Sequence, residues 1–138
     1  MMDSAAHYVS PEEYRHLLAR TQIAMMMHDQ NSRMLEVNQA FADLLGYSLA
    51  EVERLDARDV VHPDDHADRA RETDALTSGA VDCVTVPGRK LRRKDGTAVW
   101  VRVHKSVVRR DGTVKIMAFY ENSWVFELWR EPGATDPE

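Results

Sequence analysis

The sequence contains very little cysteine, with Cys83 the only one among 138 residues. A single cysteine excludes an internal disulfide and a zinc site built from several cysteines. No apolar run approaches the ~18 residues that a membrane-spanning helix needs. The first residues also lack the basic and apolar regions of a secretory signal. We therefore expect a cytoplasmic location and no membrane partner for this chain, which could be a whole protein or a piece of a longer one.

Positive charge is scarce relative to negative charge, with 18 Lys and Arg against 23 Asp and Glu. A surface that neutralises nucleic-acid phosphates needs a basic excess, so we expect no nucleic-acid partner. There is no Ser/His/Asp arrangement, glycine-rich phosphate loop or pair of catalytic carboxylates. We therefore expect no enzyme activity and assign no catalytic residue. The length and composition fit one globular domain.

The first half of the chain carries start and stop signals for short helices. Ser10 to Glu13 forms a capping box that predicts a helix over about 11–21. Apolar runs at 23–28 and 34–37 predict two strands around a polar turn, although the methionines at 25–27 leave a helical continuation open. Three further helices are predicted: one from Asn38 to Gly46, one from a capping box at Ser48, and one over about 65–78 capped by Asp64 or Asp65.

The last third of the chain predicts β-structure. Asp95-Gly96 and Asp111-Gly112 are hairpin turns between alternating apolar residues. Val99, Val101 and Val103 should share one face of the intervening strand. Pro87-Gly88 predicts a bulge or bend in the strand before it.

These elements and their motifs resemble the PAS family. The motifs that carry the resemblance are Asn38 with Ala40-Phe41 and Leu44-Leu45, Gly46-Tyr47-Ser48 with Glu51, His62-Pro63-Asp64-Asp65, and Arg93-Lys94-Asp95-Gly96 with Trp100-Val101. Glu121-Asn122-Ser123 departs from the Asp-Ile-Thr of many relatives, which puts the usual coupling to a downstream effector in doubt. The resemblance implies an α/β (α+β) fold: a five-stranded antiparallel sheet, short helices over one face and an N-terminal flanking helix. The expected divisions are a flanking segment at 1–21, the PAS-like domain at 22–123 and a tail at 124–138.

The resemblance also implies a sensory, signal-transducing role. Such a domain binds a small ligand or a protein partner and relays a conformational change, here through a homodimer. A domain that only dimerises, with a filled core and no ligand, is the main alternative. A metal-dependent small enzyme and a haem-based gas sensor are less favoured.

Two groups of apolar residues are candidate sites. The expected pocket, suited to a small apolar ligand, is lined by Met25, Met27, Phe41, Leu45, Leu76, Val101, Met117 and Phe119. Ordinary core filling is the alternative, and it is the favoured one for the methionines. The expected interface consists of Tyr14, Leu17, Leu18, Trp124, Phe126 and Trp129, and packing on the chain's own sheet is its alternative.

Metal and cofactor chemistry has weaker support. His62 and His66 are four residues apart, but His62 precedes a proline and the pair need not share a helical face, so we expect no metal. Cys83 lies in a predicted strand, where a small buried hydrophobe is the usual role, and no flavin motif is present. Haem-binding relatives carry an axial histidine where this chain has Arg69. We therefore expect neither haem nor flavin.

Overall fold

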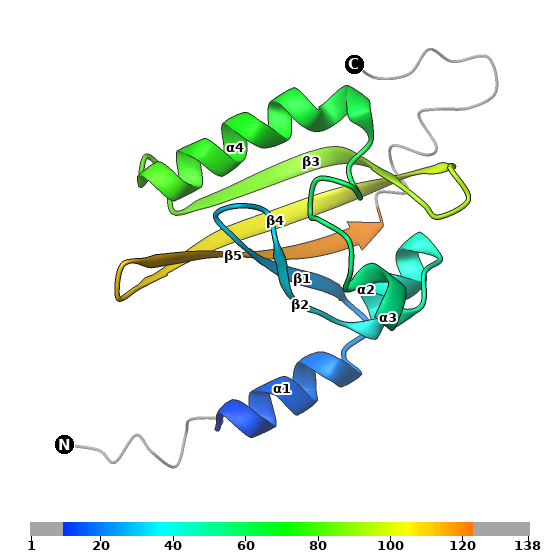
Figure 1. Ribbon diagram of the computed structural model, residues 1–138, viewed down its shortest axis with the longest axis horizontal. Coiled ribbons are helices and arrows are strands. Elements are labelled where there is room, and N and C mark those ends of the chain that lie inside the picture. The colour runs from blue at the N-terminus through cyan, green and yellow to red at the C-terminus, as the bar shows by residue number, and fades with distance from the viewer. Residues whose placement is uncertain (1–9, 123–138) are drawn as a thin grey trace.

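The computed structural model describes residues 10–122 and shows a five-stranded antiparallel sheet with helices packed on one face (Figure 1). In chain order the elements are α1 (Pro11–Arg20), β1 (Ala24–Asp29), β2 (Met34–Val37), α2 (Gln39–Leu45), α3 (Leu49–Val52), the 3-10 turn η2 (Pro63–Asp65), α4 (His66–Ser78), β3 (Cys83–Arg92), β4 (Ala98–Arg110) and β5 (Thr113–Asn122). The expected fold class is confirmed. Within residues 10–122, no helix is both long and apolar enough to cross a bilayer.

The strand order is β2-β1-β5-β4-β3, which places β5 at the centre of the sheet. This explains why both faces of β5 carry apolar residues in the sequence. We call the face that packs against α2 and α4 the inner face. The main core cluster lies there and includes Ala24, Met26, Phe41, Leu45, Val52, Leu91, Val99, Val101, Val103, Ala118 and Tyr120.

The methionine run at 25–27 is part of β1 and does not continue a helix. Asn38 ties this strand to α2, because its Oδ1 accepts hydrogen bonds from the backbone N–H groups of Met25 and Phe41, each at 3.0 Å. Its Nδ2 donates to the carbonyl oxygen of Ile23 at 2.8 Å. A helix cap predicted from the sequence thus also joins two elements.

The predicted turns and the predicted bulge are confirmed. Asp111 and Gly112 have φ values of 51° and 78°, the left-handed pair that a two-residue hairpin needs. In β3 the register shifts between Val86 and Arg89, on either side of Pro87-Gly88. After this shift Arg89 pairs with Val101 and points to the inner face.

Candidate functional site

The most unusual contact in the structure is the one between α4 and the inner face of the sheet. From the sequence, α4 has few large apolar residues, and its position on the surface was expected. The structure places it over the sheet, with Arg69, Thr73 and Leu76 buried. These positions follow i, i+4, i+7 spacing, so they form one face of the helix. A helix with a largely polar inward face needs polar partners on the sheet.

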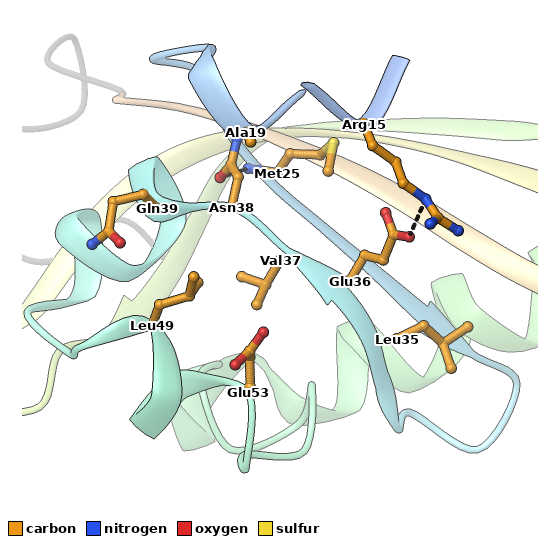
Figure 2. A pocket seen from close by; sticks show the side chains of 10 residues that line it. All are labelled: Arg15, Ala19, Met25, Leu35, Glu36, Val37, Asn38, Gln39, Leu49 and Glu53. Carbon is orange, nitrogen blue, oxygen red and sulfur yellow. Dashed lines mark hydrogen bonds and ion pairs between the residues drawn. The ribbon is translucent and has the colours of Figure 1, made fainter. Parts of the chain in front are cut away.

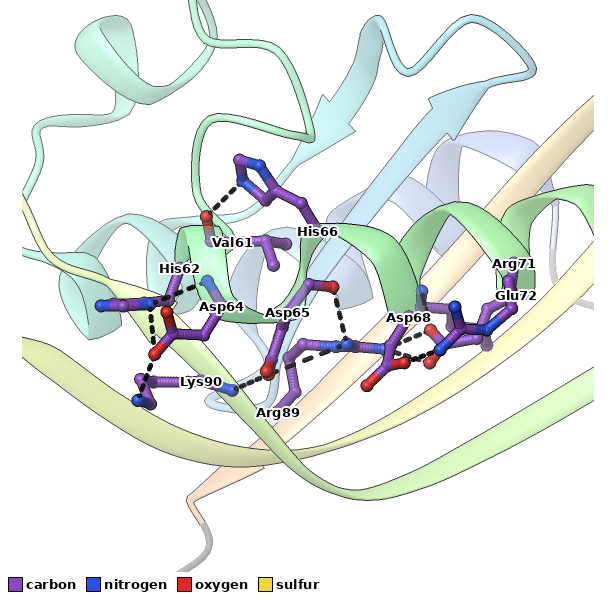
Figure 3. Close-up of polar contacts among 11 residues, drawn as sticks. Val61, His62, Asp64, Asp65, His66, Asp68, Arg71, Glu72, Arg89 and Lys90 are labelled. Carbon is purple, nitrogen blue, oxygen red and sulfur yellow. Dashed lines mark hydrogen bonds and ion pairs between the residues drawn. The ribbon is translucent and has the colours of Figure 1, made fainter. Parts of the chain in front are cut away.

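Glu72 on α4 supplies the centre of an ion-pair cluster. Its carboxylate accepts hydrogen bonds from Arg89 of β3 and, at 2.8 Å, from Nζ of Lys105 of β4 (Figure 3 shows Glu72 and Arg89). The two cations are 2% and 6% exposed. Nη1 of Arg89 also lies 3.8 Å from Oδ2 of Asp65. Side chains from four elements therefore meet between α4 and the sheet.

Arg69 is the third buried cation of this region and is 5% exposed. Within residues 10–122 its guanidinium makes one hydrogen bond, from Nη2 to Oγ of Ser32 at 3.1 Å. Ser32 is itself buried in the β1–β2 turn, with a left-handed φ of 70°. Burial lowers the pKa of Arg69 below its ordinary value, although an arginine with even a reduced pKa stays protonated.

Three buried groups, His28, Lys105 and Tyr120, have pKa values shifted from their usual ranges. Burial lowers the pKa of His28 to about 4, and the positive charges of Arg69 and Lys105 contribute to this shift. The His28 ring is therefore neutral at pH 7. Burial also lowers the pKa of Lys105 to about 8, against the opposing effect of Glu72. The Tyr120 hydroxyl, whose pKa is raised by burial, feels the charges of Arg69 and Arg89.

The His62–Asp65 segment anchors the start of α4 to β3 (Figure 3). Oδ2 of Asp65 accepts a hydrogen bond from the backbone N–H of Lys90 at 2.8 Å, and Asp64 pairs with Nζ of Lys90 at 3.1 Å. Asp65 is the N-cap residue of α4, one of the two predicted, but its side chain makes no cap hydrogen bond. Nδ1 of His62 accepts from the N–H of Asp64 at 3.2 Å instead.

The two histidines considered for metal binding have protein partners. Nε2 of His66 lies 2.9 Å from the carbonyl oxygen of Val61, so this nitrogen donates, while His62 caps the η2 turn. Across residues 10–122, no group of three or more His, Cys, Asp and Glu side chains is placed to hold a metal ion. Cys83 was expected to be a buried hydrophobe. That expectation is wrong, because its side chain is exposed.

The structure divides the eight predicted pocket residues between two faces of the sheet. Phe41, Leu45, Leu76 and Val101 lie on the inner side, each with 0% exposure. Met25, Met27, Met117 and Phe119 alternate with inner-face residues along β1 and β5, so they lie on the outer face. Pairing across the two strands brings Met25 beside Phe119 and Met27 beside Met117.

A groove with a volume of about 460 Å³ lies beside the edge strand β2 (Figure 2). Arg15 and Ala19 of α1 line one side, and Leu49 of α3 and Glu53, the C-cap residue of that helix, line another. Met25 also lines this groove and is the one member of the predicted pocket to do so. An exposed ion pair of 3.8 Å joins Arg15 to Glu36 of β2.

The predicted interface residues lie mostly beyond what the structure describes. Leu17 is on α1 and is 57% exposed. Tyr14 and Leu18 belong to the same helix, but their side chains are outside the described set. Trp124, Phe126 and Trp129 also lie outside the described residues.

The sequence-based interpretation missed the ion-pair cluster, although two signals for it are present. Lys105 continues the alternation of Val99, Val101 and Val103, which places it on the inner face. Arg69 and Leu76 share one face of α4 by their spacing. Neither signal identifies the carboxylate that pairs with each buried cation, because the partners come from distant parts of the chain.

Comparison with known proteins agrees with this architecture. The model of the PAS fold family matches residues 12–119. A domain of a sensory box sensor histidine kinase/response regulator from Geobacter sulfurreducens has a TM-score of 0.71 at 19% identity, covering 87% of this chain and 100% of that one. The PAS domain of an HTR-like protein from Haloarcula marismortui has a TM-score of 0.68 at 21% identity, covering 80% and 89%. At these identities the likeness concerns the fold.

One curated relative is the probable diguanylate cyclase DgcE of Escherichia coli (strain K12), 28% identical over 105 residues. The match covers 75% of this chain but only 9% of that protein, so the chain corresponds to a small part of it.

The chain belongs to the PAS family. A PAS domain from a two-component sensor histidine kinase shares this fold, with a TM-score of 0.68 at 16% identity.

Proposed function

We propose that this PAS domain is a cytoplasmic input module that binds a small ligand or a protein partner and relays the change through a homodimer built with α1. The observation that carries the proposal is the exposure of α1. Every side chain described in this helix is exposed, and Leu17 is 57% exposed. The nearby Ile23 and Leu35 are 53% and 41% exposed.

The short length of α1 indicates that the helix needs a packing partner to be stable. The helix has only 10 residues, although Ser10 and Glu13 form a complete capping box at its start. An isolated helix shorter than about 12–15 residues is marginal in water, and its stability normally comes from packing. An exposed helix with apolar residues at its surface therefore gains from being covered.

The charges around the groove favour a second copy of the chain as the partner. Arg15 is positive, while Glu36 and Glu53 across the groove are negative. A twofold-symmetric interface pairs a patch with itself, so a patch that carries both signs can exchange its ion pairs between subunits. Movement of the sheet would then reach the dimer through β2, whose residues line the same groove.

The experiment compares the mass in solution of the full chain with that of two variants. Sedimentation equilibrium should give a dimer for the wild type, and Leu17→Glu or deletion of residues 1–21 should give a monomer. The matched control is Val81→Glu, at another exposed apolar residue that is remote from α1 in sequence. An unchanged mass for all variants would remove the dimer from the proposal.

The alternative is a dimerisation domain without a ligand. The full burial of Phe41, Leu45 and Val101 favours it, because these predicted pocket residues already pack against protein atoms. Native mass spectrometry after gentle purification separates the two functions, since a bound small molecule favours the sensor. An absorption spectrum of the same sample tests for haem and flavin.

A further inference from the structure

The polar region between α4 and the sheet holds more positive than negative charge. Its cations are Arg69, Arg89 and Lys105, all buried. Its carboxylates are Glu72 and Asp65, at 16% and 19% side-chain exposure. The excess is one positive charge, and an uncompensated charge in a protein interior is costly.

The excess charge is located at Arg69. Glu72 is engaged by Arg89 and Lys105, and Asp65 lies near Arg89. Asp56, whose charge also acts on Arg69, is paired with Arg58 at 3.0 Å. In the part of the chain that the structure describes, Arg69 has no carboxylate within ion-pair distance, and its one hydrogen bond goes to a hydroxyl. A guanidinium carries five N–H donors, so most of those of Arg69 make no hydrogen bond to another residue within 10–122.

A second buried group beside Arg69 also has unused capacity. Thr73 lies one turn further along the same face of α4 and is 9% exposed. Its Oγ1 has no hydrogen-bond partner within residues 10–122. Side chains at i and i+4 of a helix are neighbours, so Arg69 and Thr73 lie side by side on the buried face of α4. The positive charges of Arg69 and Lys105 both help to lower the pKa of His28.

We propose that Arg69 and Thr73 form the anion-binding part of the ligand site, and that the ligand is a small molecule with a single carboxylate. This inference rests on the sensory function proposed above and names the chemical class of its ligand. A carboxylate matches the planar fork of a guanidinium, which donates two parallel hydrogen bonds to it. The Thr73 hydroxyl donates a third.

The charge balance selects a monocarboxylate over a phosphate. One negative charge neutralises the excess at the site, whereas a phosphate dianion would reverse it. A carboxylate here also competes with Glu72 for Lys105, so binding changes the ion pairs that hold α4 on the sheet.

The experiment measures thermal unfolding of the full chain in sodium acetate, propionate, benzoate and succinate, with sodium chloride keeping the ionic strength constant. Sodium phosphate is a separate arm. A monocarboxylate should raise the melting temperature in a saturable way. At a concentration of about 100 times its Kd it should reduce the unfolded fraction about a hundredfold. Phosphate and chloride should give no saturable change.

Two variants and one control locate the effect. Arg69→Gln should abolish the carboxylate response, while Arg71→Gln, at an exposed arginine of the same helix, should retain it. Thr73→Val keeps the side-chain shape and removes an unpaired buried hydroxyl, so it should be at least as stable without ligand yet bind less tightly. This variant keeps the test valid if Arg69→Gln fails to fold.

The outcomes are distinct. An equal response in the wild type and Thr73→Val, or no saturable response to any carboxylate, overturns the carboxylate site. The latter result would mean that buried water satisfies these groups. Because the dimer is measured separately by sedimentation of the Leu17 variant, loss of the carboxylate site leaves the proposed dimer standing, and the reverse also holds.

Discussion

Nζ of Lys105 lies 2.8 Å from Oε1 of Glu72, joining the middle of β4 to the inward face of α4. Both side chains are largely buried, at 6% and 16% exposure. The pair therefore fixes the helix over the sheet where an apolar contact would be usual. Ion pairs of this kind are sensitive to the loss of one partner, because the other charge stays buried.

Replacing Glu72 tests this arrangement. Glu72→Gln keeps the shape of the side chain but removes the counter-charge of Lys105 and leaves Arg89 only the longer contact with Asp65, at 3.8 Å. We expect a loss of about 3–5 kcal/mol in the free energy of unfolding, measured by urea denaturation. The control is Asp68→Asn, at an exposed residue of α4 paired with Arg71, where the change should stay within about 0.5 kcal/mol. Equal losses in the two variants would contradict a special role for Glu72.

His28 should make the protein sensitive to acid. Its pKa is about 4 in the folded chain and 6.5 in the unfolded reference. Between these values the unfolded state binds more protons, so stability falls as the pH falls, by up to about 1.4 kcal/mol per pH unit. Urea denaturation across this range should show the slope in the wild type and in His16→Gln, whose residue is exposed. His28→Gln should lose it, and a full slope in that variant would exclude His28 as its source.

Asn38 should contribute more than an ordinary helix cap. It is 4% exposed and serves two backbone N–H groups and one carbonyl group. Loss of a cap costs about 0.5–2 kcal/mol, and each buried unsatisfied group adds about 1–3 kcal/mol. We expect Asn38→Ala to lower the free energy of unfolding by roughly 2–4 kcal/mol on these grounds. Gln39→Ala, at the exposed neighbouring residue, is the control. A loss below 1 kcal/mol, on the order of a cap alone, would mean that the strand contact adds nothing.

Cys83 should react in the native protein. Because its thiol is exposed at the start of β3, a disulfide reagent should modify one thiol per chain without denaturant. Cys83→Ser should show no reaction, and its free energy of unfolding should differ by less than about 0.5 kcal/mol, as expected for a surface substitution. Reaction only after unfolding would place the thiol in the interior.

Local signals predicted most of the secondary structure. The capping boxes at Ser10 and Ser48 and the left-handed glycines Gly46 and Gly79 mark helix ends in the structure as they do in the sequence. Such signals work because a cap bond or a positive φ involves only residues close in the chain. The prediction that Val99, Val101 and Val103 share one face of β4 is confirmed for the same reason.

The candidate site was predicted less well. The sequence suggested eight apolar pocket residues, but the pleat of β1 and β5 places Met25 and Phe119 on the face opposite Phe41. Residue type alone does not give the phase of a strand when both of its faces carry apolar residues. Met25 and Met26 are buried on opposite faces, so burial alone does not distinguish them.

The sequence by itself determined the order of the elements, their turns and the family, because these follow from contacts between residues a few positions apart. Only the tertiary structure decided that the polar helix α4 packs over the sheet. There Glu72 of α4 meets Arg89 and Lys105 of the sheet, and Arg69 of α4 bonds Ser32. Arg69 and Lys105 are 36 positions apart in the sequence. The free-energy cost of burying each charge depends on which opposite charge the fold brings to it, and residues close in the chain do not determine that.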